Sequence, residues 1–140
     1  MNSISFLFLL VLLACGPAPE DSNLAEAAKA HDEAMEISSD VSSALDSLQD
    51  LQDSLSSEQR IELGELRQAL AEWRDLAVEV PGYEHEGHDH DHHHGPNELE
   101  GLPSDQVLEI QKELKKQIEV LHAKVEQLSK EQNPGLDDGV

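Results

Sequence analysis

Histidines are concentrated in one short segment of the chain. Six of the eight lie between residues 85 and 94, within the stretch YEHEGHDHDHHHG, where carboxylates alternate with them. Neutral imidazole is the commonest protein ligand for divalent transition metals, so these residue types favour metal binding. The candidate ligands are His85, His88, His90, His92, His93 and His94, with Asp89 and Asp91 as weaker donors that tune the charge.

The spacing of these histidines favours reversible binding over a closed structural site. Alternate residues of an extended chain point to the same side, so His88, His90 and His92 form one row. Ordering six loop residues costs about 6 to 12 kcal/mol, whereas a micromolar dissociation constant corresponds to about −8 kcal/mol. We therefore expect weak to micromolar binding of zinc, copper or nickel, and no metal requirement for folding. The alternative is a solvated linker that is merely rich in histidine.

A second, smaller donor pair lies near the N-terminus. His31 and Met35 are four residues apart, which places them on one face of a helix. An imidazole and a thioether are donors typical of a copper site. The alternative is a flanking histidine beside a methionine at the edge of the core, and His122 is expected to be a histidine of the same ordinary kind.

The start of the chain resembles the leader of a bacterial lipoprotein. Residues 4–14 are almost wholly apolar, which is too short for a membrane span of roughly 20 residues but suits a signal peptide. The tetrad Leu12-Leu13-Ala14-Cys15 that follows resembles the lipobox. This resemblance implies cleavage before Cys15, a lipid on that cysteine and attachment to the membrane. Gly16, where an inner-membrane protein of this kind has Asp, implies the outer membrane of the bacterial envelope.

The composition narrows the class of protein. Thirty acidic against nine basic residues give a net charge of −21, which excludes nucleic acid as a partner and raises the local concentration of cations. Cys15 is the only cysteine, so no disulfide forms within the chain. Aromatic residues are sparse, and no nucleophile–base pattern, phosphate-binding loop or HExxH motif is present. We therefore expect a binding protein and not an enzyme.

Periodic apolar residues predict an all-α fold. The chain divides into a signal peptide (1–14), a lipidated tether (15–23), two helices within 24–80, a disordered His/Asp-rich loop (81–103), a third helix (104–132) and an acidic tail (133–140). The expected helices cover 24–55, 57–79 and 105–132, with Ser22 or Asn23, Ser56 and Ser104 as N-caps. They predict a three-helix antiparallel bundle or a coiled-coil hairpin.

The apolar stripes define the predicted core. The first helix carries a 3-4 alternation over Ala27, Ala30, Ala34, Ile37, Val41, Ala44, Leu48, Leu51 and Leu55. The second carries Leu63, Leu66, Leu70, Trp73, Ala77 and Val80, and the third carries Val107, Ile110, Leu114, Ile118, Leu121, Val125 and Leu128. Such stripes pack either within one chain or against a helical partner or a second copy.

Several loose motifs are similar to small helical lipoproteins of the Bacteroidetes. They are the stretch 31–35 (HDEAM), Ala71-Glu72-Trp73, Pro81-Gly82, the His/Asp loop and the lysine-rich stretch 111–116. This resemblance implies an envelope location and a helical form, and no particular activity.

These observations support two hypotheses. In the first, a lipid-anchored envelope protein binds divalent metal through residues 85–94 as a buffer, sensor or delivery protein. In the second, a structural or adaptor lipoprotein uses its helical seam for protein–protein interaction.

Overall fold

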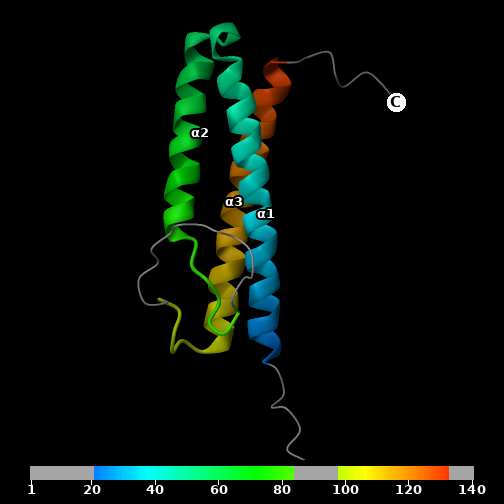
Figure 1. Ribbon diagram of the computed structural model, residues 1–140, viewed down its shortest axis with the longest axis vertical. Helices are drawn as coiled ribbons and strands as arrows, with labels where there is room; N and C mark the ends of the chain where they lie inside the picture. The colour runs from blue at the N-terminus through cyan, green and yellow to red at the C-terminus, as the bar shows by residue number, and fades with distance from the viewer. Residues whose placement is uncertain (1–20, 84–97, 133–140) are drawn as a thin grey trace, which may run out of the picture.

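The described part of the chain folds into three long helices (Figure 1). The computed structural model describes residues 21–83 and 98–132. Helix α1 covers Ser22–Asp50, α2 covers Ser57–Leu76 and α3 covers Ser104–Gln132, with a short 3-10 helix η1 at Gln52–Ser54. The predicted all-α class is confirmed, and within the described ranges no helix is both long enough and apolar enough to cross a membrane. The predicted signal peptide, lipidation residue, most of the His-rich loop and the tail lie outside the described residues.

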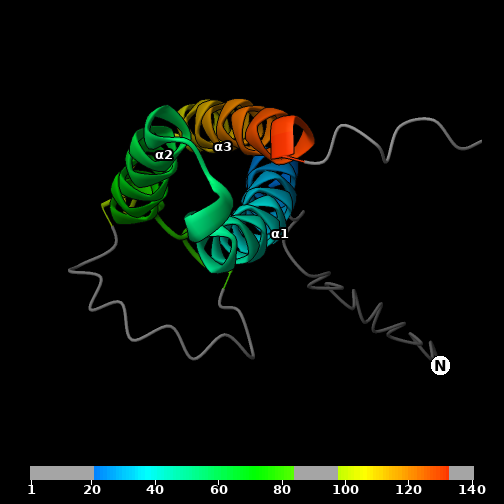
Figure 2. The same cartoon turned by 90° about the horizontal axis from the view of Figure 1, so that it is seen from above.

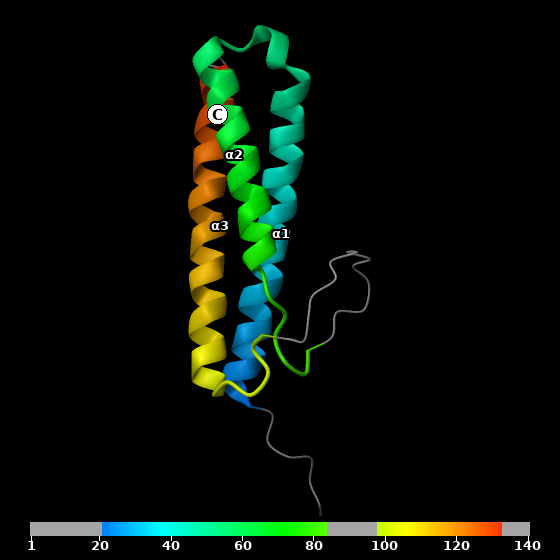
Figure 3. The ribbon, with the colours of Figure 1, turned by 90° about the vertical axis from the view of Figure 1, so that its left-hand side faces the viewer.

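The helices form an up-down-up bundle. α1 and α3 run parallel and lie side by side along their length, while α2 runs antiparallel to both (Figure 1 and Figure 3). Seen from the end, the three helices are arranged around a common axis (Figure 2), and all three contribute side chains to one buried cluster. The bundle, and not an extended hairpin, is therefore the form that the chain adopts.

The main core confirms the predicted stripes of α2 and α3. All six predicted residues of the second stripe are buried, and so are all those of the third except Ile110, which is partly buried. The main cluster consists of Ala34, Val41, Leu45, Leu48, Leu55, Leu63, Leu66, Leu70, Trp73, Ala77, Ile118, Leu121, Val125 and Leu128. The apolar stripes of one chain therefore cover one another.

The predicted seam of α1 is wrong at three positions. The predicted residues at 27, 30, 34, 41, 48 and 55 are buried, whereas Ile37 and Ala44 are only partly buried and Leu51 is exposed. At two of these positions the buried residue is the next one along, Ser38 and Leu45, and His31 is buried beside Ala30. A search for apolar residues could not find the polar His31 and Ser38. Leu51, which was expected in the core, is 48% exposed, whereas Leu45 is 1% exposed.

The helix ends differ from prediction by a few residues. α1 ends at Asp50 and not at 55, because the chain turns there: the Leu51 N–H donates to the Leu48 carbonyl at 3.1 Å. α2 ends at Leu76 and not at 79. Pro81 restricts only the residue before it, so it does not fix the end of α2. The chain instead leaves the helix at Ala77, which is in an extended conformation.

Side-chain caps fix the starts of α1 and α2, whereas Ser104, the predicted cap of α3, is the first residue of that helix. Ser56 and Gln59 form the predicted capping box at the start of α2, with bonds of 3.2 and 3.0 Å. The cap of α1 is Asp21, one residue before the predicted choices, and its carboxylate accepts from the Asn23 N–H at 3.0 Å. A hydrogen bond from the Ser104 hydroxyl to the same carboxylate is the main cause that lowers the pKa of Asp21. This bond ties the start of α1 to the start of α3.

The corrected seam predicts the cost of two matched truncations. We expect Leu45→Ala to lower the free energy of unfolding by about 2–4 kcal/mol, because it empties a fully buried site. We expect Leu51→Ala to cost less than about 1 kcal/mol, because that side chain is half exposed. Urea unfolding followed by circular dichroism measures both. Equal losses would contradict the assigned phase.

Candidate metal-binding segment and its anchors

The structure describes the chain on both sides of the histidine-rich segment. The eight candidate ligands from His85 to His94 fall within residues 84–97, outside the described residues. The residues that enter and leave this segment are described, as are His31 and Met35. The residues that flank the segment therefore show where the bundle holds its two ends.

The upstream anchor is a tight turn at residues 80–83. The Val80 side chain is buried, and the Tyr83 N–H donates to the Val80 carbonyl at 3.1 Å. Gly82 has φ +80°, which is the left-handed conformation that a type II turn requires at its third position, after Pro81 at its second. This part of the predicted loop is ordered and packed.

The downstream anchor repeats this arrangement. The Leu99 side chain is buried, and its carbonyl accepts from the Leu102 N–H at 3.2 Å. Gly101 occupies the third position of this turn with φ +87°. Residues 98–103 therefore also have a defined structure, although the prediction placed them in the disordered loop.

Both anchors insert into the same hydrophobic cluster. Val80 and Leu99 pack with Ala27 and Ala28 of α1 and Val107 of α3, and Tyr83 lies against the cluster's edge. This cluster lies near the first turns of α1 and α3 (Figure 3). The bundle therefore holds both ends of the histidine-rich segment at one end of the molecule.

A polar chain connects this end of the bundle to His31. Gln111, fully buried on α3, donates from Nε2 to the Val78 carbonyl at 2.7 Å, and its Oε1 lies 3.3 Å from Nδ1 of His31. A carbonyl only accepts, so the contact with Val78 fixes the orientation of the amide, and Oε1 then requires a donor. Nδ1 of His31 therefore carries the proton.

His31 and Met35 share a face but are held differently. His31 is buried, and Met35 is partly buried against the main core. The neighbouring Glu33 is bound to Lys115 at 2.6 Å. Among the described residues, no three histidine, cysteine or acidic side chains converge in a way that could hold a metal ion. His122, on the other half of α3, is 4.0 Å from the Glu126 carboxylate.

Two ion pairs join α1 to α3 outside the core. Lys112 contacts Glu26 at 2.7 Å, and Lys115 contacts Glu33 at 2.6 Å. The hydrogen bond to Lys115 lowers the pKa of Glu33, and the reciprocal contact raises the pKa of Lys115. Both pairs reinforce the parallel packing of the two long helices.

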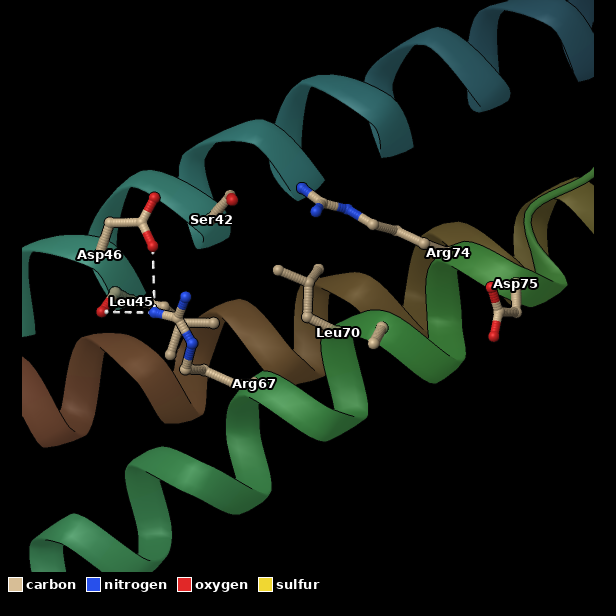
Figure 4. Close-up of a pocket in the computed structure, with 8 residues that line it drawn as sticks. Ser42, Leu45, Asp46, Arg67, Leu70, Arg74 and Asp75 are labelled. Carbon is tan, nitrogen blue, oxygen red and sulfur yellow. Dashed lines mark hydrogen bonds and ion pairs between the residues drawn. The ribbon is translucent and has the colours of Figure 1, made fainter. Parts of the chain in front are cut away.

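A groove between α1 and α2 was not predicted (Figure 4). It has a volume of about 260 Å³ and is lined by Ser42, Leu45, Asp46, Arg67, Leu70, Ala71, Arg74 and Asp75. Arg67 reaches across it to the Asp46 carboxylate at 3.0 Å and to the Leu45 carbonyl at 3.4 Å. Arg74 donates from Nε to the Ser38 hydroxyl at 3.3 Å. The apolar periodicity gave no signal for this groove, because it arises where two helices with small side chains face each other.

Comparison of the chain with protein-family models, with curated proteins and with solved structures finds no match.

The buried amide predicts a stability difference between two glutamine variants of α3. We expect Gln111→Leu to lower the free energy of unfolding by about 1–3 kcal/mol, because it leaves the Val78 carbonyl and His31 Nδ1 without this partner. The control Gln117→Leu replaces an exposed glutamine and should change stability by less than about 0.5 kcal/mol. Chemical unfolding checks both, and an unchanged Gln111→Leu protein would contradict the assigned hydrogen bonds.

The Glu33–Lys115 pair predicts a pH dependence of stability. Because the folded pKa of Glu33 is lowered, the contribution of its carboxylate is present above the unfolded pKa and is lost as pH falls through the lowered value. We therefore expect Glu33→Gln to be less stable than the parent at neutral pH and to converge with it in acid. Thermal melts across this range test the prediction, with the exposed Glu36→Gln as control. A gap between parent and Glu33→Gln that stays constant with pH would contradict it.

Proposed function

We propose that this protein binds divalent transition metal in the cell envelope, through a histidine-rich segment that a helical bundle holds at both ends. The observation that carries the proposal is the shared cluster of Val80 and Leu99. These anchors consist of described residues on either side of segment 84–97, and they bring its two ends to one place. The lipid on Cys15 that the lipobox implies attaches this unit to the outer membrane.

Anchoring both ends favours binding by the segment. Closing a flexible loop costs entropy, and the bundle has already met that cost when it folds. The ions then have to order only the residues that ligate them. The net charge of −21 also raises the cation concentration around the segment. Zinc, copper and nickel are the ions that imidazole and carboxylate donors favour.

The chemistry of the segment supports a buffer, sensor or delivery protein more than an enzyme. Six histidines and the adjacent acids offer many overlapping ligand sets, so ions can exchange between them. Catalysis by a metal requires a fixed, open coordination position. A segment with interchangeable ligand sets suits storage and transfer.

The rival role is that of an adaptor that recruits a helical partner. The apolar stripes that suggested this role face one another inside a single chain. The large apolar side chains left exposed in the described ranges are Leu51, Ile61, Leu76, Leu102 and Val120. They come from different helices and turns, and no single stripe unites them. Metal binding is therefore the better supported function.

Calorimetric titration of the metal-free protein with zinc or copper tests the proposal. We expect about one to three ions to bind with weak to micromolar affinity at neutral pH. Binding should fade as pH falls through about 6.5, because protonated imidazole cannot ligate. Changing all six histidines of 85–94 to Ala should abolish the heat of binding.

Two control variants make this test specific. Changing the four acids at 84, 86, 89 and 91 to their amides should weaken binding but retain it, because the imidazoles remain. His122→Ala removes a histidine outside the segment and should leave the titration unchanged. Equal heats from the parent and the six-histidine variant would overturn the proposal.

A further inference from the structure

The groove between α1 and α2 is separate from the anchors of the histidine-rich segment. Leu45 and Leu70 lie beneath it with only 1% and 5% of their surface exposed, so the apolar surface open to a ligand comes mainly from Ala71 and the aliphatic stems of Arg67 and Arg74. Ser42 on α1 and Ala71 on α2 are small, so the two helices do not close over these leucines. Figure 4 shows Arg67 and Arg74 extending from α2 toward α1 on either side of Leu70. The result is an apolar surface between two guanidinium groups.

Of the two arginines that line the groove, one has a carboxylate partner. Arg67 is neutralised by Asp46 at 3.0 Å. Asp75 points away from Arg74 (Figure 4). Arg74 is partly buried, and its recorded hydrogen bond joins Nε to the neutral Ser38 hydroxyl. Within residues 21–83 and 98–132, no carboxylate lies within ion-pair distance of Arg74.

Arg74 is unusual among the basic residues that the structure describes. Only Arg74 and Lys115 are partly buried, and the others are exposed. Lys115 has a carboxylate partner, Glu33, at 2.6 Å. A chain with thirty acids and nine bases supplies carboxylates in excess, yet Arg74 has none in the described part of the chain. Its terminal nitrogens are therefore suited to an anion from outside.

We infer that this groove binds a small monocarboxylate with a short apolar chain. The planar guanidinium of Arg74 is suited to grip a carboxylate through paired hydrogen bonds. The apolar chain of the ligand would lie against Ala71 and the aliphatic stems of Arg67 and Arg74. A single carboxylate gives Arg74, the groove arginine without an ion-pair partner, its counter-ion, whereas a phosphate dianion would bring a second negative charge beside Asp46 and Asp75.

The net charge of the protein limits the affinity but does not prevent binding. Exposed charges farther away than about 8 Å are largely screened at physiological salt. The groove is open to solvent and small, so we expect a dissociation constant of about 1 mM, equivalent to about −4 kcal/mol. Affinity of this size is measurable by titration of an NMR spectrum.

The test is a titration of the 15N-labelled full chain with sodium hexanoate. We expect saturable shifts of the backbone amides of Ser42, Leu70, Ala71 and Arg74. Hexanamide, which has the same chain without the charge, should cause no saturable shift. Shifts that do not saturate, or that hexanamide reproduces, would overturn the inference.

Three variants assign the binding to the groove. Arg74→Gln should weaken hexanoate binding at least about tenfold, while Arg60→Gln, an exposed arginine on the same helix, should leave it unchanged. Ala71→Leu fills the groove without removing Arg74 and should also abolish binding. The dispersion of each spectrum verifies that the variant is folded. Unchanged binding by folded Arg74→Gln, or an equal loss in Arg60→Gln, would overturn the inference.

Discussion

The parallel packing of α1 against α3 is the contact on which the rest of the structure depends. Parallel helices place like ends of their dipoles together, so this arrangement requires compensation. The antiparallel α2 supplies part of it. The Asp21 carboxylate, which caps α1 and accepts from Ser104 at the start of α3, places a negative charge between the two positive helix ends. The ion pairs Lys112–Glu26 and Lys115–Glu33 continue the connection along the helices.

Polar residues in the seam make this packing specific. An apolar seam tolerates a shift of one heptad, because any large aliphatic side chain fills the next site about as well. The hydrogen bond between His31 and Gln111 forms only when α1 and α3 are in one register. Gln111 also donates a hydrogen bond to the Val78 carbonyl. The same residue therefore fixes the extended chain that leaves α2. Trp73 adds a similar constraint by donating to the Leu114 carbonyl at 2.9 Å.

These polar seam residues also explain which parts of the fold could be predicted from the sequence. The stripes of α2 and α3 are apolar at nearly every core position, so periodicity located them correctly. In α1 the core includes His31 and Ser38, and a search for apolar residues moved the seam onto Ile37 and Ala44, which are only partly buried. Partners such as Gln111 for His31 and Arg74 for Ser38 are 80 and 36 residues away. Spacing along the chain carries no information about contacts of that range.

The candidate site shows the same division between local and long-range information. Its ligand types are visible in the sequence, and so are the two glycines that form the flanking turns. The convergence of Val80 and Leu99 on one cluster is a tertiary fact that no local pattern contains. This convergence supports the proposed division of the chain into a supporting bundle and a metal-binding segment. Both hydrophobic clusters are assembled by residues 21–83 and 98–132, so the proposed metal binding uses donors from a different stretch of the chain. On the proposed function, substitutions of imidazoles or acids in the segment would change the affinity for metal, whereas the stability of the bundle would depend on the clusters of α1, α2 and α3.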